Sequence, residues 1–315
     1  MYAIIDIGSN TIRLVVYQLQ QGRLRSMFQK KVMAGLGSYV NKDNNMKEEG
    51  IQRAIEVLKD FQSICQYVNV NQMFIIATAS FRNVDNTREI VRRIYKEVGV
   101  KVHVLSGEEE AMFDFMGATH MGQQKRGMIV DIGGGSMELV EFDHCNAKDA
   151  VSIPLGSLNM YYRFVSKLFP TKEEEREIRK NVRRELRKQH IPKQKIIVGV
   201  GGTYRASMKL YNDFYQLEPG NCQMDVDRFG NLLDKLNNGK KVKIHRILRV
   251  VPDRVHTVIP GMIMMDELNK YYHCKRIEIS SWGVREGYLL SKLQAQEALQ
   301  ETPSSGAEDC EEKKE

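Results

Sequence analysis

The amino-acid sequence predicts a duplicated α/β fold in which two related halves enclose a cleft. The first observation is an internal repeat: residues 3–17 read AIIDIGSNTIRLVVY, and residues 128–142 read MIVDIGGGSMELVEF. The two segments align without gaps at an offset of 125 and share six identical residues in fifteen. A repeated segment indicates a repeated structural unit. The other observations are a third Gly-rich turn and helical patterns between the turns.

Each copy of the repeat is expected to form a β-hairpin. An apolar run rich in β-branched residues precedes Asp6 in one copy and Asp131 in the other, which is typical of a strand. Small, Gly-rich residues follow, and a second apolar run then returns. The two hairpins would place the same Asp-Ile-Gly turn at equivalent points of the two halves.

The third turn lies in IIVGVGGTYRAS, residues 196–207, and leads from a strand into a helix. Strands alternating with helices are typical of an α/β fold. Helical periodicity predicts helices over 47–68, 84–98, 107–118, 158–167, 171–189, 203–214, 226–237 and 255–272.

The length of 315 residues favours two domains, because it exceeds what one hydrophobic core usually organises. We expect a first domain over 1–122, ending at the polar segment GQQKRG, and a second over 123–297. The polar, charged residues 298–315 are expected to be a disordered tail.

Composition is that of a globular protein, with 42% hydrophobic and 28% charged residues. The net charge of +7 suits a polyanionic ligand and equally a solvated surface. The five cysteines are far apart, which argues against a zinc site or a disulfide framework and fits a reducing compartment. We find no signal peptide and no apolar run long enough to span a membrane, so a cytoplasmic location is expected.

The segment 171–189 is intensely charged. Glu173 and Glu177, like Arg179 and Arg183, are at helical spacing. The favoured interpretation is an exposed helix with internal ion pairs. The alternative is a basic rim for a polyanion.

The Gly-rich turns are candidate phosphate-binding loops. Glycine lets main-chain N–H groups approach a ligand closely, and successive N–H groups in a turn form an anion-binding concavity. Glycines can also serve hairpin geometry alone, but here hydroxyl or amide side chains accompany them in three turns. The candidate phosphate-binding residues are Gly8, Ser9, Asn10, Thr11, Arg13, Gly133, Gly134, Gly135, Ser136, Gly201, Gly202 and Thr203.

Carboxylates beside the turns are candidate metal ligands. Asp6 and Asp131 end the strands that precede the two turns, where a carboxylate can hold Mg²⁺ directly or through water. An aspartate there can instead bond its own turn amides. Glu138, at the position that matches Arg13 in the first copy, is a further carboxylate that could face the cleft.

The segment VHVLSGEEEAMFDFMG, residues 102–117, supplies a candidate general base. Ser106 and Glu109 match a capping box, which gives Glu109 a structural role. Glu110 lies about 100° away around the helix and could activate water, although the residues alone do not separate it from Glu108.

Arginines supply candidate phosphate clamps. Arg82 follows a strand and precedes a helix, where a fixed guanidinium could bind phosphate oxygens bidentately or form a surface ion pair. Arg254 and Arg285 have the same two interpretations. The Met-rich segment GMIMMDEL, residues 261–268, is expected to be core.

These motifs together resemble the exopolyphosphatase / guanosine pentaphosphate phosphohydrolase family. The matching segments run in family order from about residue 3 to residue 290. They are DIGSNTIRLVV, ATASFRN, SGEEEA, VDIGGGSMEL, IPLGS, GVGGTYRA, VIPG and SSWGVREG. The combination of VDIGGGSMEL with an upstream SGEEEA is specific to the family, whereas the Asp-Ile-Gly turn alone is shared with sugar kinases, actin and heat-shock chaperone ATPase domains.

The resemblance implies a ribonuclease H-like, actin-like ATPase fold and a role for each motif. Glu110 would be the catalytic base, Arg82 would position phosphate, and Asp131 and Glu138 would face Mg²⁺ or another divalent cation. The chain looks like the short, two-domain exopolyphosphatases, since it stops where many members continue into helical domains.

The expected function is exopolyphosphatase activity, in which water releases terminal orthophosphate from inorganic polyphosphate with Mg²⁺. The alternatives are a guanosine pentaphosphate 5′-phosphohydrolase, a kinase of the same fold, and a non-catalytic polyphosphate or nucleotide sensor. A base for water argues against the kinase. The expected ligand is polyphosphate or a phosphorylated guanine nucleotide, with no membrane or specific nucleic acid as partner, and a homodimer stays open.

Overall fold

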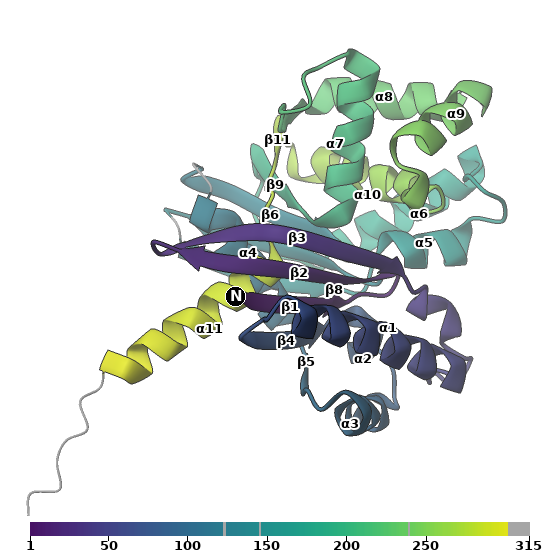
Figure 1. Ribbon diagram of the computed structural model, residues 1–315. Helices are drawn as coiled ribbons and strands as arrows, with labels where there is room; N and C mark the ends of the chain where they lie inside the picture. The colour runs from purple at the N-terminus through teal and green to yellow at the C-terminus, as the bar shows by residue number, and fades with distance from the viewer. Residues whose placement is uncertain (122–123, 145, 239, 302–315) are drawn as a thin grey trace, which may run out of the picture.

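Two mixed β-sheets, each covered by helices, form the two lobes of the molecule (Figure 1). The computed structural model describes residues 1–121, 124–144, 146–238 and 240–301. In the part of the chain that it describes, no helix is long and apolar enough to cross a membrane.

The first sheet has five strands in the order β3-β2-β1-β4-β5. They are β1 Tyr2–Ile7, β2 Thr11–Gln20, β3 Arg23–Met33, β4 Gln72–Ala77 and β5 Val102–Val104. The predicted hairpin is β1–β2, which is antiparallel and pairs Ile4 with Val15.

The second sheet has six strands in the order β10-β11-β9-β6-β7-β8. They are β6 Arg126–Ile132, β7 Met137–Asp143, β8 Asn146–Ile153, β9 Ile196–Val200, β10 Gln223–Asp225 and β11 Arg276–Ile279. Its hairpin β6–β7 pairs Ile129 with Val140, the residues that match Ile4 and Val15. The repeat therefore gives the same register in both halves.

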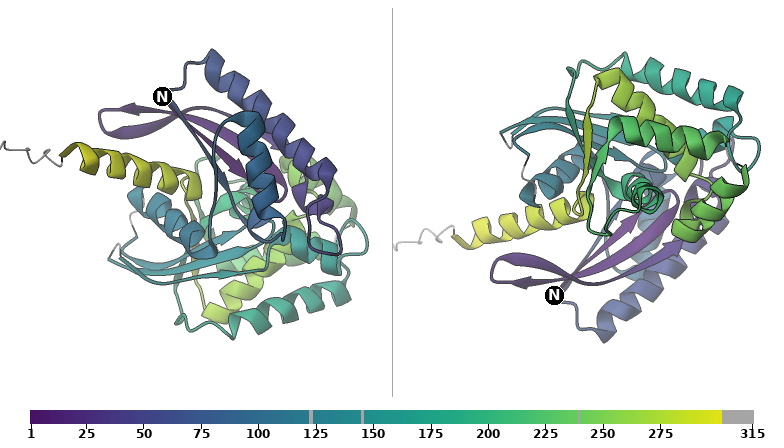
Figure 2. Two further views of the ribbon diagram at one scale, coloured as in Figure 1. Left: turned by 90° about the horizontal axis from the view of Figure 1, so that it is seen from below. Right: turned by 90° about the horizontal axis from the view of Figure 1, so that it is seen from above.

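Helices cover the outer face of each sheet, where alternate strand residues form the two large cores (Figure 2). On the first sheet these are η1 Leu36–Tyr39, α1 Glu48–Tyr67, α2 Ala79–Arg82 and α3 Thr87–Val98. In the second half they are α5 Ser157–Phe164, α6 Lys172–Leu186, α7 Gly201–Tyr215, α8 Val226–Asn238, α9 Lys240–Val250, η2 Pro252–Arg254 and α10 Val258–Tyr272.

Two helices, α4 Gly107–Met121 and α11 Val284–Glu301, lie between the sheets and pack against each other. Helix α4 belongs to the first half by sequence, yet it packs on strands of the second sheet. Helix α11 follows the second half and packs on the first sheet. A Cβ on Gly287 would lie 1.9 Å from the Phe113 carbonyl oxygen, so the two backbones approach more closely than any side chain permits. The packing thus crosses the expected division at residue 122.

Several expected elements differ from the structure. The helix expected over 84–98 begins only at Thr87, after the separate short helix α2. Helices α9 and α11 were not expected, and α11 runs to Glu301, so the tail expected from residue 298 is helical at its start. The rest of that expected tail, residues 302–315, lies outside the described residues.

The charged segment 171–189 forms α6, with Thr171 as the N-cap of a capping box. Arg179 pairs with Glu175 at 2.7 Å within the helix and with Asp266 at 2.6 Å on α10. Arg183 pairs with Glu267 at 2.6 Å. The pair within α6 agrees with the favoured interpretation, whereas the pairs with α10, on the buried side of the helix, were not expected.

Candidate active site

The two Asp-Ile-Gly turns face each other at the gap between the lobes, and they have the same hydrogen-bonded geometry. The N–H of Gly8 donates to the carbonyl of Thr11 at 3.0 Å, and the N–H of Gly133 donates to the carbonyl of Ser136 at 2.9 Å. A Cβ on Gly135 would lie 3.0 Å from the Ser9 hydroxyl oxygen, so the loops of the two halves are in contact.

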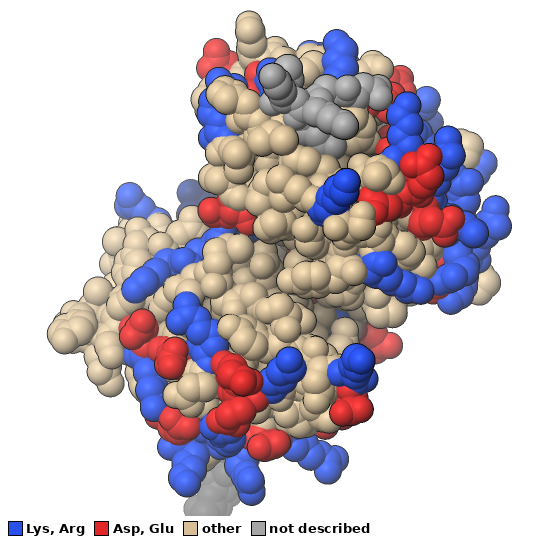
Figure 3. Space-filling view, turned by 90° about the vertical axis from the view of Figure 1, so that its right-hand side faces the viewer, with Lys and Arg blue, Asp and Glu red and all other residues tan. Residues whose placement is uncertain are grey.

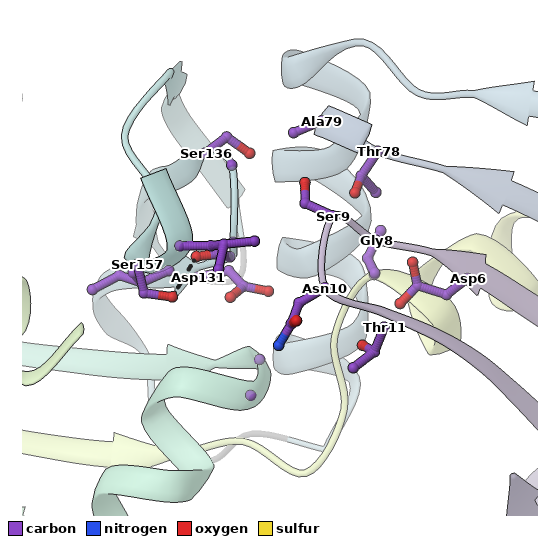
Figure 4. A pocket seen from close by; sticks show the side chains of 18 of the residues that line it. Asp6, Gly8, Ser9, Asn10, Thr11, Thr78, Ala79, Asp131, Ser136 and Ser157 are labelled. Atoms are coloured by element: carbon purple, nitrogen blue, oxygen red, sulfur yellow. Dashed lines mark hydrogen bonds between the residues drawn. The ribbon is translucent and has the colours of Figure 1, made fainter. Parts of the chain in front are cut away.

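A pocket of about 110 Å³ lies between these turns. Figure 4 shows Asp6, Ser9, Asn10 and Thr11 on one wall and Asp131, Ser136 and Ser157 on the other. The predicted site residues that line it are Asp6, Gly8, Ser9, Asn10, Thr11, Arg13, Glu110, Asp131, Gly133, Gly134, Gly135, Ser136, Gly201 and Gly202.

The third turn contributes the start of α7. Gly201 has a φ of 79°, and a Cβ there would lie 2.0 Å from Asp131 Oδ1, so both the conformation and the close approach require glycine. The N-cap, Val200, offers no side-chain cap, which leaves the first N–H groups of the 15-residue helix directed at the pocket. The N-terminus of a helix favours anions, including phosphate.

Thr203 does not line the pocket, contrary to expectation. Its side chain is buried, and its hydroxyl donates to the carbonyl of Ile132 at 2.6 Å. Ser80 donates in the same way to the carbonyl of Ile7 at 2.6 Å in the first half. Both hydroxyls thus hold the Asp-Ile-Gly strand ends in place, and the residues of this turn that line the pocket are Gly201 and Gly202.

Glu110 lines the pocket, but its side chain is largely buried. Arg82 donates to Glu110 Oε2 at 2.6 Å, to the Leu105 carbonyl at 3.1 Å and to the Ser136 hydroxyl at 3.2 Å. Burial raises the pKa of Glu110, the charge of Arg82 lowers it, and the result is a pKa of about 7. A carboxylate with this pKa is well matched to accept a proton near neutrality.

The capping box predicted for α4 is present. The Glu109 side chain accepts from the N–H of Ser106 at 2.8 Å, and the Ser106 hydroxyl accepts from the N–H of Glu109 at 3.1 Å. The structure therefore separates the glutamates that the sequence left ambiguous: Glu109 caps the helix and Glu110 lines the pocket, whereas Glu108 does not line it.

Arg82 and Glu138 lie behind the pocket wall and do not line it. Glu138 is 1% exposed, accepts a hydrogen bond from Ser152 at 2.8 Å and lies 3.6 Å from Arg82. Burial raises its pKa well above the usual range. Both residues therefore act on the pocket through neighbours in this arrangement, and direct contact with phosphate or metal stays a prediction.

Asp131 and Glu138 are register partners at the end of the hairpin β6–β7. Asp131 Oδ1 and Glu138 Oε2 are buried without a hydrogen-bond partner among the described residues. In the same residues, no three Asp, Glu, His or Cys side chains converge on one point. Mg²⁺ is commonly held by one or two carboxylates together with substrate phosphates, so this pair fits such a cation once a phosphate completes the site.

Asp6 differs from Asp131 because a cation already compensates it. Arg285 donates to Asp6 Oδ2 at 3.2 Å. The matching position in the second half carries Asp131 with an unpaired oxygen. The metal role predicted for Asp6 would require it to share its carboxylate with Arg285.

Four arginines are among the residues that line the pocket: Arg13, Arg205, Arg254 and Arg285. Burial and neighbouring arginines lower the pKa of Arg13 to about 10 and lower the pKa of Arg205. Burial, and then the charge of Arg205, lower the pKa of Arg254. Such a concentration of positive charge is suited to a polyanion.

Arg205 was missed in the sequence, although a signal for it existed. It lies four residues after Gly201 on the predicted helix, so helical spacing places it on the same face as the turn. Arg254 and Arg285 were recognised only as ambiguous cations. Nothing in their local sequence shows that η2, which carries Arg254, and the start of α11, which carries Arg285, meet at the same pocket.

The structure is a duplicated α/β fold with a cationic pocket between its two halves. A model of the Ppx/GppA phosphatase family matches residues 15–296, and the chain belongs to that family.

Solved structures agree with this assignment. An Aquifex aeolicus Ppx/GppA family member is 25% identical, with a TM-score of 0.79, and the match covers 94% of this chain and 98% of that one. A second Aquifex aeolicus PPX-GPPA enzyme structure is 27% identical, with a TM-score of 0.76, over 92% and 98% of the chains. An exopolyphosphatase from Cytophaga hutchinsonii has the same fold at 20% identity, with a TM-score of 0.83, over 93% and 98%.

Proposed function

We propose that this phosphatase is an exopolyphosphatase that releases terminal orthophosphate from inorganic polyphosphate. The observation that carries the proposal is the position of Glu110, a buried carboxylate with a pKa of about 7, beside a pocket walled by two phosphate-type turns. A base for water at the end of a cationic pocket suits hydrolysis of a terminal phosphoryl group.

In this proposal the chain's own groups position the phosphate and accept the proton. Main-chain N–H groups of the Gly133–Ser136 turn and of the α7 N-terminus would bind the terminal phosphoryl oxygens. Arg82 holds Glu110 Oε2, which leaves Oε1 to take the proton as water attacks phosphorus and the bond to the bridging oxygen breaks. Positioning and charge stabilisation dominate catalysis of phosphoryl transfer.

Asp131 and Glu138 would hold Mg²⁺ or another divalent cation, directly or through water. When bound, the cation would supply positive charge to the phosphate oxygens. The unpaired buried oxygens of these two residues support this assignment.

Guanosine pentaphosphate is the second candidate substrate, because its terminal phosphate needs the same chemistry. A kinase of the same fold is less consistent with the match to a phosphatase family. A sensor would need the pocket but not the proton acceptor. The residues therefore favour hydrolysis.

The test is a phosphate-release assay on tripolyphosphate, long-chain polyphosphate, guanosine pentaphosphate and ATP, each with Mg²⁺ and with a chelator. We expect Mg²⁺-dependent release from the polyphosphates. Release from guanosine pentaphosphate alone would favour the second candidate. Polyphosphate binding without release from any substrate would identify a sensor.

A further inference from the structure

A second cavity of about 530 Å³ lies directly beside the reaction pocket, and four residues line both. The shared residues are Arg13, Gly202, Arg205 and Arg254. The wall between the two cavities is therefore formed mainly by guanidinium groups. A ligand that occupies both would pass along these arginines.

One side of the second cavity is a face of α7. Gly202, Arg205 and Lys209 are spaced by three and four residues, so they lie along one stripe of the helix. The stripe begins at the helix N-terminus in the reaction pocket and extends about 10 Å along the helix axis. Lys209 is exposed at its far end.

The opposite side comes from the first half. Arg13 on β2 and Lys31 on β3 are register partners, so their side chains leave the same face of the sheet. Gln29, two residues before Lys31, lies on that face as well. Like charges directly opposite on paired strands are destabilising unless an anion compensates them.

The cavity has a strong excess of positive charge. Five cationic side chains line it, and among the described residues Asp253 is its one carboxylate. Asp253 binds Lys31 at 2.7 Å and so joins η2 of the second half to β3 of the first. On the face seen in Figure 3, Lys and Arg alternate with Asp and Glu over both lobes, so the excess in the cavity is not a continuation of a basic surface there.

We propose that this second cavity binds the distal phosphates of an extended polyphosphate whose terminal phosphate lies in the reaction pocket. The proposal rests on the proposed function. The described lining offers no aromatic ring on which a nucleobase could stack, whereas its lysines and arginines suit a linear polyanion. Lys209 and Lys31 are then specificity-determining residues that favour long chains over tripolyphosphate.

Because Lys31 is paired with Asp253, one substitution is expected to strengthen the binding of long chains instead of weakening it. A long chain has to compete with Asp253 for Lys31, so removing the Asp253 charge would strengthen binding of long chains. Its side chain is 58% exposed, and the substitution Asp253→Asn is not expected to affect folding.

The experiment is calorimetric titration of long-chain polyphosphate and of tripolyphosphate into Glu110→Gln protein, in which turnover does not interfere. Adding Lys209→Ala is expected to weaken long-chain binding roughly three- to tenfold and to lower the slope of log affinity against log salt concentration by about one. Adding Asp253→Asn is expected to tighten long-chain binding. Tripolyphosphate affinity should change much less in both cases, and Lys96→Ala, an exposed lysine on α3, serves as the matched control.

Unchanged long-chain affinity in both variants, or equal changes for long and short chains, would overturn the second subsite even if the wild-type protein hydrolyses polyphosphate. If the variants show the expected changes in affinity but the wild-type protein releases phosphate from no polyphosphate, the subsite is supported and the proposed function is overturned. The two proposals can therefore fail separately.

Discussion

At the residue scale, the proposed chemistry depends on how burial and one arginine set the proton affinity of Glu110. Burial penalises the charged carboxylate, and Arg82 at 2.6 Å offsets part of this penalty. Asp114, one helical turn further along α4, is 1% exposed, and neither of its side-chain oxygens has a hydrogen-bond partner among the described residues. The pKa of Asp114 is accordingly raised well above its usual range, chiefly by burial and then by the charges of Asp131 and Glu110.

The pKa of Glu110 predicts the pH dependence of hydrolysis. A general base has to be deprotonated, so kcat/KM should rise about tenfold per pH unit below about pH 7 and level off above it. Initial rates of phosphate release between about pH 5 and about pH 9 measure this profile. Glu109→Gln, which alters the neighbouring cap, should leave the inflection in place, and a profile that is flat through pH 7 contradicts the assignment.

Asp114→Asn should stabilise the protein, and more so at higher pH. The folded-state pKa is raised, so the folded state binds the proton more tightly, and its stability falls as pH rises from the unfolded-state value of about 4. Asparagine does not titrate, so the substitution removes this pH-dependent loss of stability. It should add about 1–3 kcal/mol to the free energy of unfolding at about pH 8. Urea denaturation at two pH values, with a chelator, checks it; an equal gain at about pH 4 would argue against this cause.

At the element scale, glycines and ion pairs fix how the helices pack. Helices α4 and α11 touch through their backbones at Gly287 and Gly117. Helix α6 is held to α10 by Arg179 and Arg183, which pair with the buried carboxylates Asp266 and Glu267. The first contact positions Glu110 on α4, and the second is remote from the pocket.

Gly287→Ala should destabilise the protein by about 3 kcal/mol, because its Cβ would overlap the Phe113 carbonyl oxygen and force the two central helices apart. Gly220→Ala is the control, since nothing lies within 4 Å of a Cβ there, and it should change stability by less than about 0.5 kcal/mol. Urea denaturation of both variants measures the difference. Equal stabilities would show that the helices can separate without cost.

Arg179→Ala should cost about 3 kcal/mol, because it leaves the buried Asp266 without one of its two cationic partners and removes a charge from beside Glu267. Arg184→Ala removes a largely exposed cation of the same helix and should have little effect. Thermal and urea unfolding test the stability difference. If Arg179→Ala left stability unchanged but weakened polyphosphate binding, the alternative interpretation of α6, a basic surface that binds a polyanion, would be correct.

At the scale of the whole molecule, contacts that cross between the halves form the pocket. Arg82 from the first half donates to Ser136 of the second, and Arg285 from the second half donates to Asp6 of the first. Tyr17 of β2 also hydrogen-bonds Glu286 of α11. Because the two facing walls of the pocket come from different halves, small movements between the lobes would change the contacts of a bound phosphate and solvent access together.

The internal repeat was sufficient to predict both hairpins, their turns and the cleft. It could predict them because each rests on local chemistry: β-branched strands, glycine turns and an aspartate at the strand end. The sequence did not predict that α4 packs on the second sheet and α11 on the first. Both helices bury residues on more than one side, so neither has a simple amphipathic pattern that indicates its partner. Arg13 was predicted and Arg254 was named as a possible clamp, but Arg205 was missed, and the sequence did not show that these arginines meet, because they do so only through long-range packing.

The central claim is that Glu110 activates water against a terminal phosphate of polyphosphate. The most direct test compares phosphate release from long-chain polyphosphate, with Mg²⁺, by the wild-type protein and by Glu110→Gln, together with calorimetric binding of the same chain. The account predicts that release falls by about 10²–10⁴ in the variant while the chain still binds. Release at the wild-type rate by Glu110→Gln would contradict it.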